Sequence, residues 1–206
     1  MDAIQNYLAF FRLHGPFSSR ETIIETVLVL LMMLVLLILN KEKWSSREKI
    51  GRVVVWSYLY LIFLFTFLAR SSTDVYHYNL NPFWTYLYIQ RTHDFEIVLE
   101  VLINCLMFVP VGILVPWTYK EYLHEDPIKE RNAILLFGLV LSLSVEILQL
   151  ITRTGLFEWD DIIHNIFGLI WGYGLYLWLQ GKKFSEIHHY FLPVFGVALA
   201  LLVVML

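Results

Sequence analysis

The chain has 206 residues, of which 58% are hydrophobic and only 16% are charged, and its formal net charge is −3. A helix needs about 20 apolar residues to cross the hydrocarbon core of a bilayer, and the sequence contains several runs of that length. These values exclude a soluble globular protein and indicate an integral membrane protein. Cys105 is the single cysteine, which excludes an intramolecular disulfide and a thiolate metal cluster.

The first predicted elements are an interfacial segment and a spanning helix. In residues 1–21, apolar side chains such as Ile4 and Phe11 repeat at helical spacing, which predicts a short helix lying in the membrane interface. A frayed terminus is the alternative. The run 22–39 is followed by "NKEKW" rather than by the small residues of a cleavage site, so it is predicted to be a retained helix and not a signal peptide.

Four further runs are predicted to span the membrane, and a short sixth run ends the chain. Their bounds are 51–69, 97–118, 132–151 and 162–179, with the sixth at 190–206. Pro110 and Pro116 should kink or interrupt the third helix. The predicted fold is therefore an all-α, polytopic transmembrane helix bundle of five to six spans. We divide the chain into an interfacial segment (1–21), a first helix with a basic loop (22–49), a four-helix membrane core (50–180) and a C-terminal helix (181–206).

The basic residues predict which way the chain faces. Ten Lys or Arg residues fall in the loops after the first, third and fifth spans, and five fall in the loops on the other side. Under the positive-inside rule the ten-residue side is cytoplasmic. Both termini, the segment 70–96 and the turn 152–161 are therefore predicted to lie outside a cell membrane.

Polar side chains recur along one face of the fourth and fifth spans, which predicts a polar cluster in the outer third of the membrane. The fourth span carries Ser142, Glu146, Gln149 and Arg153, and the fifth carries Asp161, Asn165, Gly168 and Gly172, all at intervals of three or four residues. Asn104 on the third span lies at a comparable depth. Buried ionisable groups are costly unless they pair or line a wet cavity. The alternative is a purely structural role, with Glu146 paired to Arg153 or Arg70.

The glycines of the fifth span form a G-x-x-x-G pattern, which predicts close helix packing and is weak evidence of function. The segment 70–96 is rich in aromatic residues. Its "NPFWTYLYI" stretch either anchors the chain at the headgroup level or re-enters the membrane as a roof over the polar cluster.

Known catalytic templates are not found: the chain has no glycine-rich phosphate loop, no H-E-x-x-H pair and no serine in a nucleophile elbow. A metal site built on Glu158, Asp160, Asp161 and His164 is an alternative, but its spacing is not diagnostic. We assign no metal and no cofactor.

Four segments resemble, in order and spacing, the VanZ-like membrane protein family. They are "NLNPF" at 79–83, "NCLMFVPVGILVP" at 104–116, "SLSVEILQ" at 142–149 and "RTGLFEWDDIIHNIFGLIWGYG" at 153–174. The resemblance covers about residues 50–180 and departs from the family pattern at Glu158 and at "NIFG". It implies an association with resistance to teicoplanin and related lipoglycopeptide antibiotics, which act on cell-wall precursors outside the membrane, without implying a known reaction.

The first functional hypothesis is that the outward polar cluster binds an amphiphile. The expected partners are membrane lipids and either a lipid-linked cell-wall precursor or the lipoglycopeptide itself, and no nucleic acid. The candidate ligand-binding residues are Arg70, Asn81, Asn104, Gln149, Arg153, Asp160 and Asn165. The second hypothesis is an intramembrane enzyme in which Glu146 or Asp161 acts as acid or base. A small transporter is a further alternative, although the polar stripes stop about halfway across.

Overall fold

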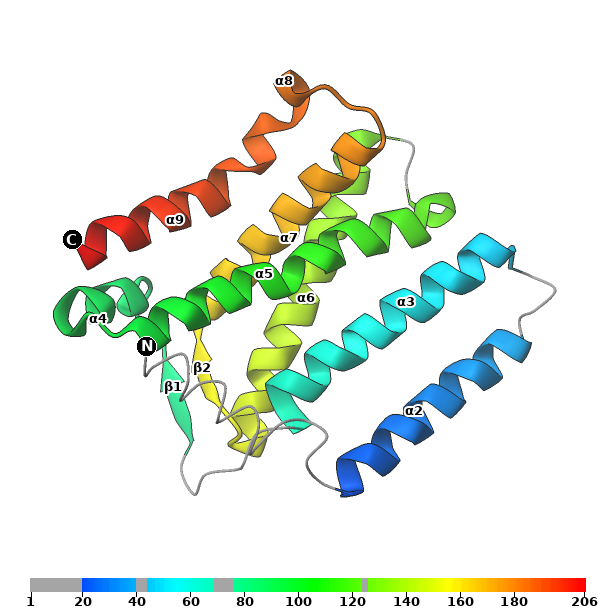
Figure 1. The fold of residues 1–206 in the computed structure, drawn as a ribbon, viewed down its shortest axis with the longest axis horizontal. Helices are drawn as coiled ribbons and strands as arrows, with labels where there is room; N and C mark the ends of the chain where they lie inside the picture. Colours follow the sequence, from blue (N-terminus) through cyan, green and yellow to red (C-terminus); the bar gives the residue numbers. More distant parts are fainter. Residues whose placement is uncertain (1–19, 40–43, 69–75, 124–125) are drawn as a thin grey trace.

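The computed structural model describes residues 20–39, 44–68, 76–123 and 126–206, and these residues are mostly helical (Figure 1). The α-helices are α2 (Arg20–Leu39), α3 (Ser46–Phe63), α4 (Trp84–Thr92), α5 (Phe95–Thr118), α6 (Pro127–Thr152), α7 (Trp159–Leu179), α8 (Phe184–Ile187) and α9 (Leu192–Met205). The π-helical turn η1 (Leu64–Leu68) continues α3, and η2 (Lys120–Tyr122) and η3 (His188–Tyr190) are 3-10 turns. Two short strands, β1 (His77–Asn79) and β2 (Leu156–Glu158), pair in parallel.

Four helices of the described chain are long and apolar enough to cross a membrane: Ser46–Thr66, Phe95–Thr118, Pro127–Thr152 and Trp159–Leu179. The α8–η3 segment and α9 are bent by 51° and make a fifth span if they are counted together. This arrangement confirms the predicted all-α, multi-pass bundle. The first predicted span falls in α2, whose apolar part, Val29–Leu39, is shorter than a complete span. The predicted interfacial helix lies almost wholly outside the described residues.

Helices α5 and α7 form the centre of the bundle, because glycines let their backbones touch. A Cβ atom on Gly168 would overlap the Cys105 carbonyl oxygen, and one on Gly172 would overlap that of Val109. From the other side, a Cβ on Gly112 would overlap the Leu169 carbonyl oxygen. The G-x-x-x-G pattern of α7 is therefore a packing surface against α5, as close helix approach in membranes requires.

The two prolines of α5 do not interrupt that helix, which continues to Thr118. The Met107 carbonyl, in the turn before Pro110, accepts a hydrogen bond of 2.8 Å from the Tyr58 hydroxyl on α3. A proline removes a backbone donor from the helix, so side-chain donors from a neighbouring helix help to satisfy the carbonyls around it. The bond also ties α3 to the central pair.

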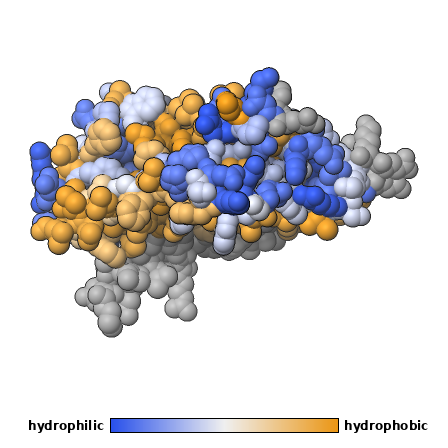
Figure 2. Space-filling model, turned by 90° about the horizontal axis from the view of Figure 1, so that it is seen from above, coloured by the Kyte–Doolittle hydropathy of each residue, from blue (hydrophilic) through white to orange (hydrophobic). Residues whose placement is uncertain are grey.

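The helices alternate in direction, so the bundle has two distinct ends. The strand end consists of β1, β2, α4 and the turn between α6 and β2. The opposite, basic end is where α3 and α6 begin and α5 and α7 end, and its described Lys and Arg residues are Arg47, Lys49, Arg52, Lys120, Lys129, Arg131, Lys182 and Lys183. Figure 2 shows hydrophilic residues gathered in the middle and right of the view from above, and hydrophobic residues over much of its left part, the side on which α9 lies in Figure 1.

Arg52 fixes the basic end by contacts with aromatic rings. Its guanidinium lies 4.0 Å from the ring centroid of Trp44, 5.0 Å from that of Tyr119 and 5.3 Å from that of Tyr122. The Glu48 carboxylate, one turn earlier on α3, lies 3.7 Å away. A partly desolvated cation over several aromatic faces is stabilised electrostatically, so Arg52 joins the start of α3 to the segment that follows α5.

Candidate functional site at the strand end

Two residues of the C-terminal part of α6, Arg153 and Glu146, hold the strand end in place. Arg153 ends this helix in the left-handed conformation (φ 59°), which turns the chain toward β2. Its guanidinium donates a 3.1 Å hydrogen bond to the Tyr76 hydroxyl and lies 4.4 Å from the centre of the Tyr76 ring. About two turns deeper in α6, the Glu146 carboxylate accepts the backbone N–H of Glu158 at 3.1 Å. Glu146 is only 2% exposed, so this carboxylate holds β2 from inside the bundle.

Asp160 anchors α4. Its two carboxylate oxygens accept the backbone N–H groups of Phe83 (2.7 Å) and Thr85 (2.9 Å), at the start of that helix. The first N–H groups of a helix have no partner within the helix, and a carboxylate placed there satisfies them and interacts favourably with the helix dipole. Asp160 is 3% exposed, so a buried residue of α7 determines where α4 lies.

Two consecutive residues of α7, both 1% exposed, face different neighbours. The His164 Nε2 atom lies 2.8 Å from the Tyr86 hydroxyl of α4, and the Asn165 amide donates a 3.0 Å hydrogen bond to the Ser142 hydroxyl of α6. His164 Nδ1 and Asn165 Oδ1 are buried without a hydrogen-bond partner in the described part of the chain, and so is Thr85 Oγ1. Buried polar atoms are usually paired, so each of these atoms has an unused capacity for a hydrogen bond.

The remaining predicted site residues are dispersed around this cluster. Gln149 donates a 2.9 Å hydrogen bond to the Thr66 carbonyl in η1, which joins α6 to α3. Asn81 is exposed, in a turn where its N–H group bonds the Asn79 side chain at 3.1 Å. Asp161 and Asn104 are half-buried on α7 and α5. Arg70 lies outside the described residues.

Glu158, which lies outside the spanning helices, has a strongly shifted pKa. Burial raises the pKa of its carboxyl to about 7 from the ordinary 4.5; a hydrogen bond from the Asn79 amide opposes the shift, and the charges of Asp160 and Glu100 add to it. From the sequence, Glu158 is a candidate only within the metal alternative. Its neighbours come from three separate segments, which the spacing along one helix does not reveal.

The Glu158 pKa predicts a pH dependence of stability. Because the folded state binds this proton more tightly than the unfolded chain, the contribution is fully present below about pH 4.5 and is lost as the pH rises to about 7. The melting temperature of wild type relative to Glu158→Gln should therefore fall across this window and level off above it. Thermal unfolding in detergent from about pH 4.5 to about pH 8 measures this difference. The exposed Glu96→Gln is the control, and a parallel pair of curves for wild type and Glu158→Gln contradicts the assignment.

An apolar groove of about 760 Å³ lies beside the polar cluster, between α4, α7 and α9. Its walls include Phe83 and Tyr86 at the strand end, Phe167 on α7, and Gly196 and Val203 on α9. Tyr86 carries a polar group in this lining, and its hydroxyl is the one that contacts His164. Tyr86 therefore connects the apolar lining of the groove to buried His164 on α7.

The metal alternative lacks a ligand set in the described part of the chain. No group of three or more His, Cys, Asp or Glu side chains is placed there to hold a metal ion. Both Asp160 oxygens instead bond backbone N–H groups, and His164 faces Tyr86.

Comparison with known proteins identifies the family. A sequence model of VanZ/LLP1 matches residues 26–180, about three quarters of the chain. The chain belongs to the VanZ/LLP1 family. The VanZ/LLP1 match begins within α2 and ends just after α7, so it contains the central helix pair and the whole strand end. Neither the curated proteins nor the solved structures show a match to this chain.

Several features of this VanZ/LLP1 chain were not predicted from its sequence. They are the β1–β2 pair, the capping of α4 by Asp160, the Tyr86–His164 contact and the groove along α9. The spacing of Asp160 and His164, four residues apart on one helix face, is a signal for a common partner on another element. The groove leaves no such signal, because α9 is apolar on all sides.

Proposed function

We propose that this VanZ/LLP1 protein binds an amphiphile at the strand end, with an acyl chain in the groove between α4, α7 and α9 and a polar headgroup beside the residues around Glu158. We further propose that this binding gives protection against teicoplanin and related lipoglycopeptides. The observation that carries the proposal is the groove of about 760 Å³, which has the size of a ligand site and is lined by Tyr86, whose hydroxyl contacts the buried His164.

The apolar groove and the polar strand end together suit one ligand that has an acyl chain and a polar headgroup. The lining of the groove is almost entirely apolar, so an acyl chain can move into it from the bilayer interior without losing polar contacts. A headgroup needs hydrogen-bond partners. The strand end offers Arg153 and half-buried Glu158 and Asp161, together with the unpartnered His164 Nδ1 atom. The predicted outward orientation of this end is consistent with antibiotics that act outside the membrane, and the orientation itself stays a prediction.

The proposal is tested by filling the groove. Gly196 lines the groove and has nothing within 4 Å of an added Cβ atom, so Gly196→Leu is chosen to place a larger side chain there. A sensitive host expressing this variant is expected to lose most of the protection against teicoplanin that wild type gives at matched protein levels. Ala198→Leu is the matched control, because Ala198 is an exposed residue of α9 outside the groove lining. Equal protection by wild type and Gly196→Leu would overturn the proposal.

An intramembrane enzyme is the second candidate, favoured by the position of Glu158. A carboxyl with a pKa near 7 that accepts a hydrogen bond from Asn79 suits proton transfer at neutral pH. Whole-cell lipid profiles distinguish the two candidates. If expression of wild type alone changes a lipid species, and Glu146→Gln and Asp161→Asn do not, the enzyme is supported; unchanged lipids with lost protection support binding.

A further inference from the structure

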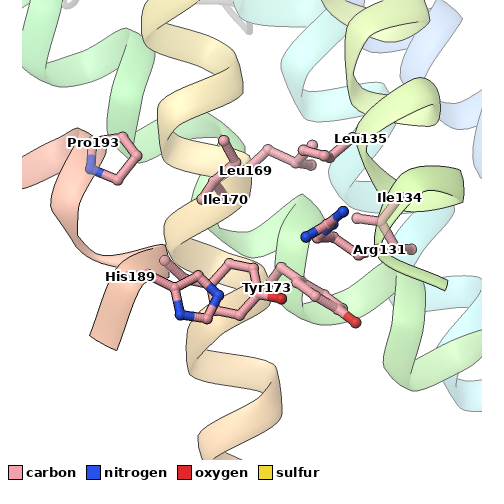
Figure 3. A pocket seen from close by; sticks show the side chains of 9 residues that line it. Arg131, Ile134, Leu135, Leu169, Ile170, Tyr173, His189 and Pro193 are labelled. Atoms are coloured by element: carbon pink, nitrogen blue, oxygen red, sulfur yellow. The ribbon is translucent and has the colours of Figure 1, made fainter. Parts of the chain in front are cut away.

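A second cavity lies near the start of α9, toward the basic end, and the proposed function does not use it. It has a volume of about 240 Å³ and lies between α6, α7 and the segment from η3 into α9 (Figure 3). Arg131, Tyr173, His189 and Tyr190 carry the polar groups of its wall, and the other lining residues are apolar. Pro193 lines both this cavity and the groove described above, so the two hollows are neighbours.

Arg131 gives this cavity a positive charge. The Nε and Nη2 atoms of its guanidinium donate hydrogen bonds to the Asn132 side-chain oxygen at 3.3 and 3.2 Å, which is a neutral partner. Among the described residues, no carboxylate forms an ion pair with Arg131. The adjacent Glu130 carboxylate is engaged by the Tyr173 hydroxyl at 3.2 Å. In Figure 3 the Arg131 guanidinium points from α6 toward α7, on the side of the cavity.

The cavity is graded from polar to apolar with depth. Arg131 lies about 6 Å from the start of α6, and Leu135 lies about 12 Å from it, at about 1.5 Å of rise per residue. On α7, Tyr173 lies about 9 Å and Leu169 about 15 Å from the end of the helix by the same measure. The polar groups thus lie at the mouth nearer the basic end, and the apolar groups lie about one turn deeper.

We propose that this cavity binds an anionic phospholipid of the leaflet at the basic end. The lipid phosphate contacts Arg131 and His189, and the first part of an acyl chain packs against Leu135, Leu169 and Ile170. A volume of about 240 Å³ is below the range of about 300–1,000 Å³ for pockets that enclose a whole drug-sized ligand, so the cavity holds only this part of the lipid. The site is separate from the strand end, and it stands whether or not the groove binds an amphiphile.

Native mass spectrometry of the purified full chain in a neutral detergent tests the site. The probes are palmitoyl-oleoyl phosphatidylglycerol and the zwitterionic phosphatidylcholine with the same chains. Wild type is expected to retain more phosphatidylglycerol, by about five-fold, because one Lys or Arg contributes about that factor to binding of an anionic headgroup. Arg131→Gln should abolish this preference, and Arg131→Lys should keep most of it.

Two control variants and a competition with inorganic phosphate complete the test. Lys129→Gln removes an exposed charge at the same end, outside the lining, and should leave the preference unchanged. Ile170→Trp fills the apolar part and should reduce retention of both lipids, while its melting temperature shows whether the fold is kept. Equal retention of the two lipids by wild type, or an unchanged preference in Arg131→Gln, overturns the proposal. Displacement of phosphatidylglycerol by inorganic phosphate would assign the cavity to a soluble anion instead.

Discussion

Gly168→Ala and Gly172→Ala are expected to prevent stable folding of the bundle. A Cβ atom on Gly168 would overlap the backbone of Cys105, and one on Gly172 would overlap the backbone of Val109 and contact Gly112. Backbone atoms of a packed helix cannot rotate away as a side chain can, so α5 and α7 must separate along their whole contact. Overpacking of this kind costs about 3 kcal/mol or more, which is a large part of the stability of a small protein.

The control for these substitutions is another glycine in a helix. Gly196→Ala adds the same methyl group to α9, where nothing lies within 4 Å of it. Alanine favours a helix over glycine by about 1 kcal/mol, so this variant should melt at the wild-type temperature or above it. Thermal unfolding in detergent and size-exclusion profiles measure the three variants together. Wild-type melting of Gly168→Ala and Gly172→Ala would show that the two helices are not packed as described.

The number and bounds of the core helices follow from the sequence, because they depend on local properties. Long apolar runs predict where α5, α6 and α7 end to within one residue, but these helices begin two to five residues before the predicted starts. The G-x-x-x-G pattern predicts the close face of α7. The polar stripes also predict the faces of α6 and α7 that pack against each other, since Asn165 donates a hydrogen bond to Ser142. A helix period read from the sequence identifies a face but not the partner of each side chain.

The roles of the acidic residues could not be predicted from the sequence, because they depend on segments distant along the chain. Asp160 was interpreted as a ligand-binding residue, but its two oxygens bond N–H groups that lie 77 and 75 residues earlier. Glu146 was interpreted as an acid or base, and its carboxylate bonds the backbone of β2. Nothing in the spacing of either residue indicates a backbone partner, because the β1–β2 pair and α4 assemble only when the bundle forms.

Asp160→Ala is expected to release α4 from the bundle. The substitution removes both acceptors of the Phe83 and Thr85 N–H groups. Thr85 is only 4% exposed, so its N–H group loses its partner in a buried position, whereas the Phe83 N–H is part-buried. Hydrogen bonds to a charged acceptor contribute about 1.5–3 kcal/mol each, and an unsatisfied buried donor costs a similar amount. Hydrogen–deuterium exchange should become faster across residues 84–92 and remain slow in α5 and α7.

Asp126 provides the matched control, since its carboxylate caps α6 by accepting the Ile128 N–H at 2.8 Å in an exposed position. Asp126→Ala leaves that N–H to water and should cost about 1 kcal/mol, with no change at α4. Asp160→Asn keeps one acceptor oxygen and should give an intermediate exchange rate. Because α4 carries Phe83 and Tyr86 to the groove, Asp160→Ala should also weaken protection against teicoplanin, although its side chain does not line the groove. Slow exchange in α4 of Asp160→Ala would mean that its other contacts, among them that of Tyr86 with His164, are enough to hold the helix. Asp160 would then not be the residue that positions this wall of the groove.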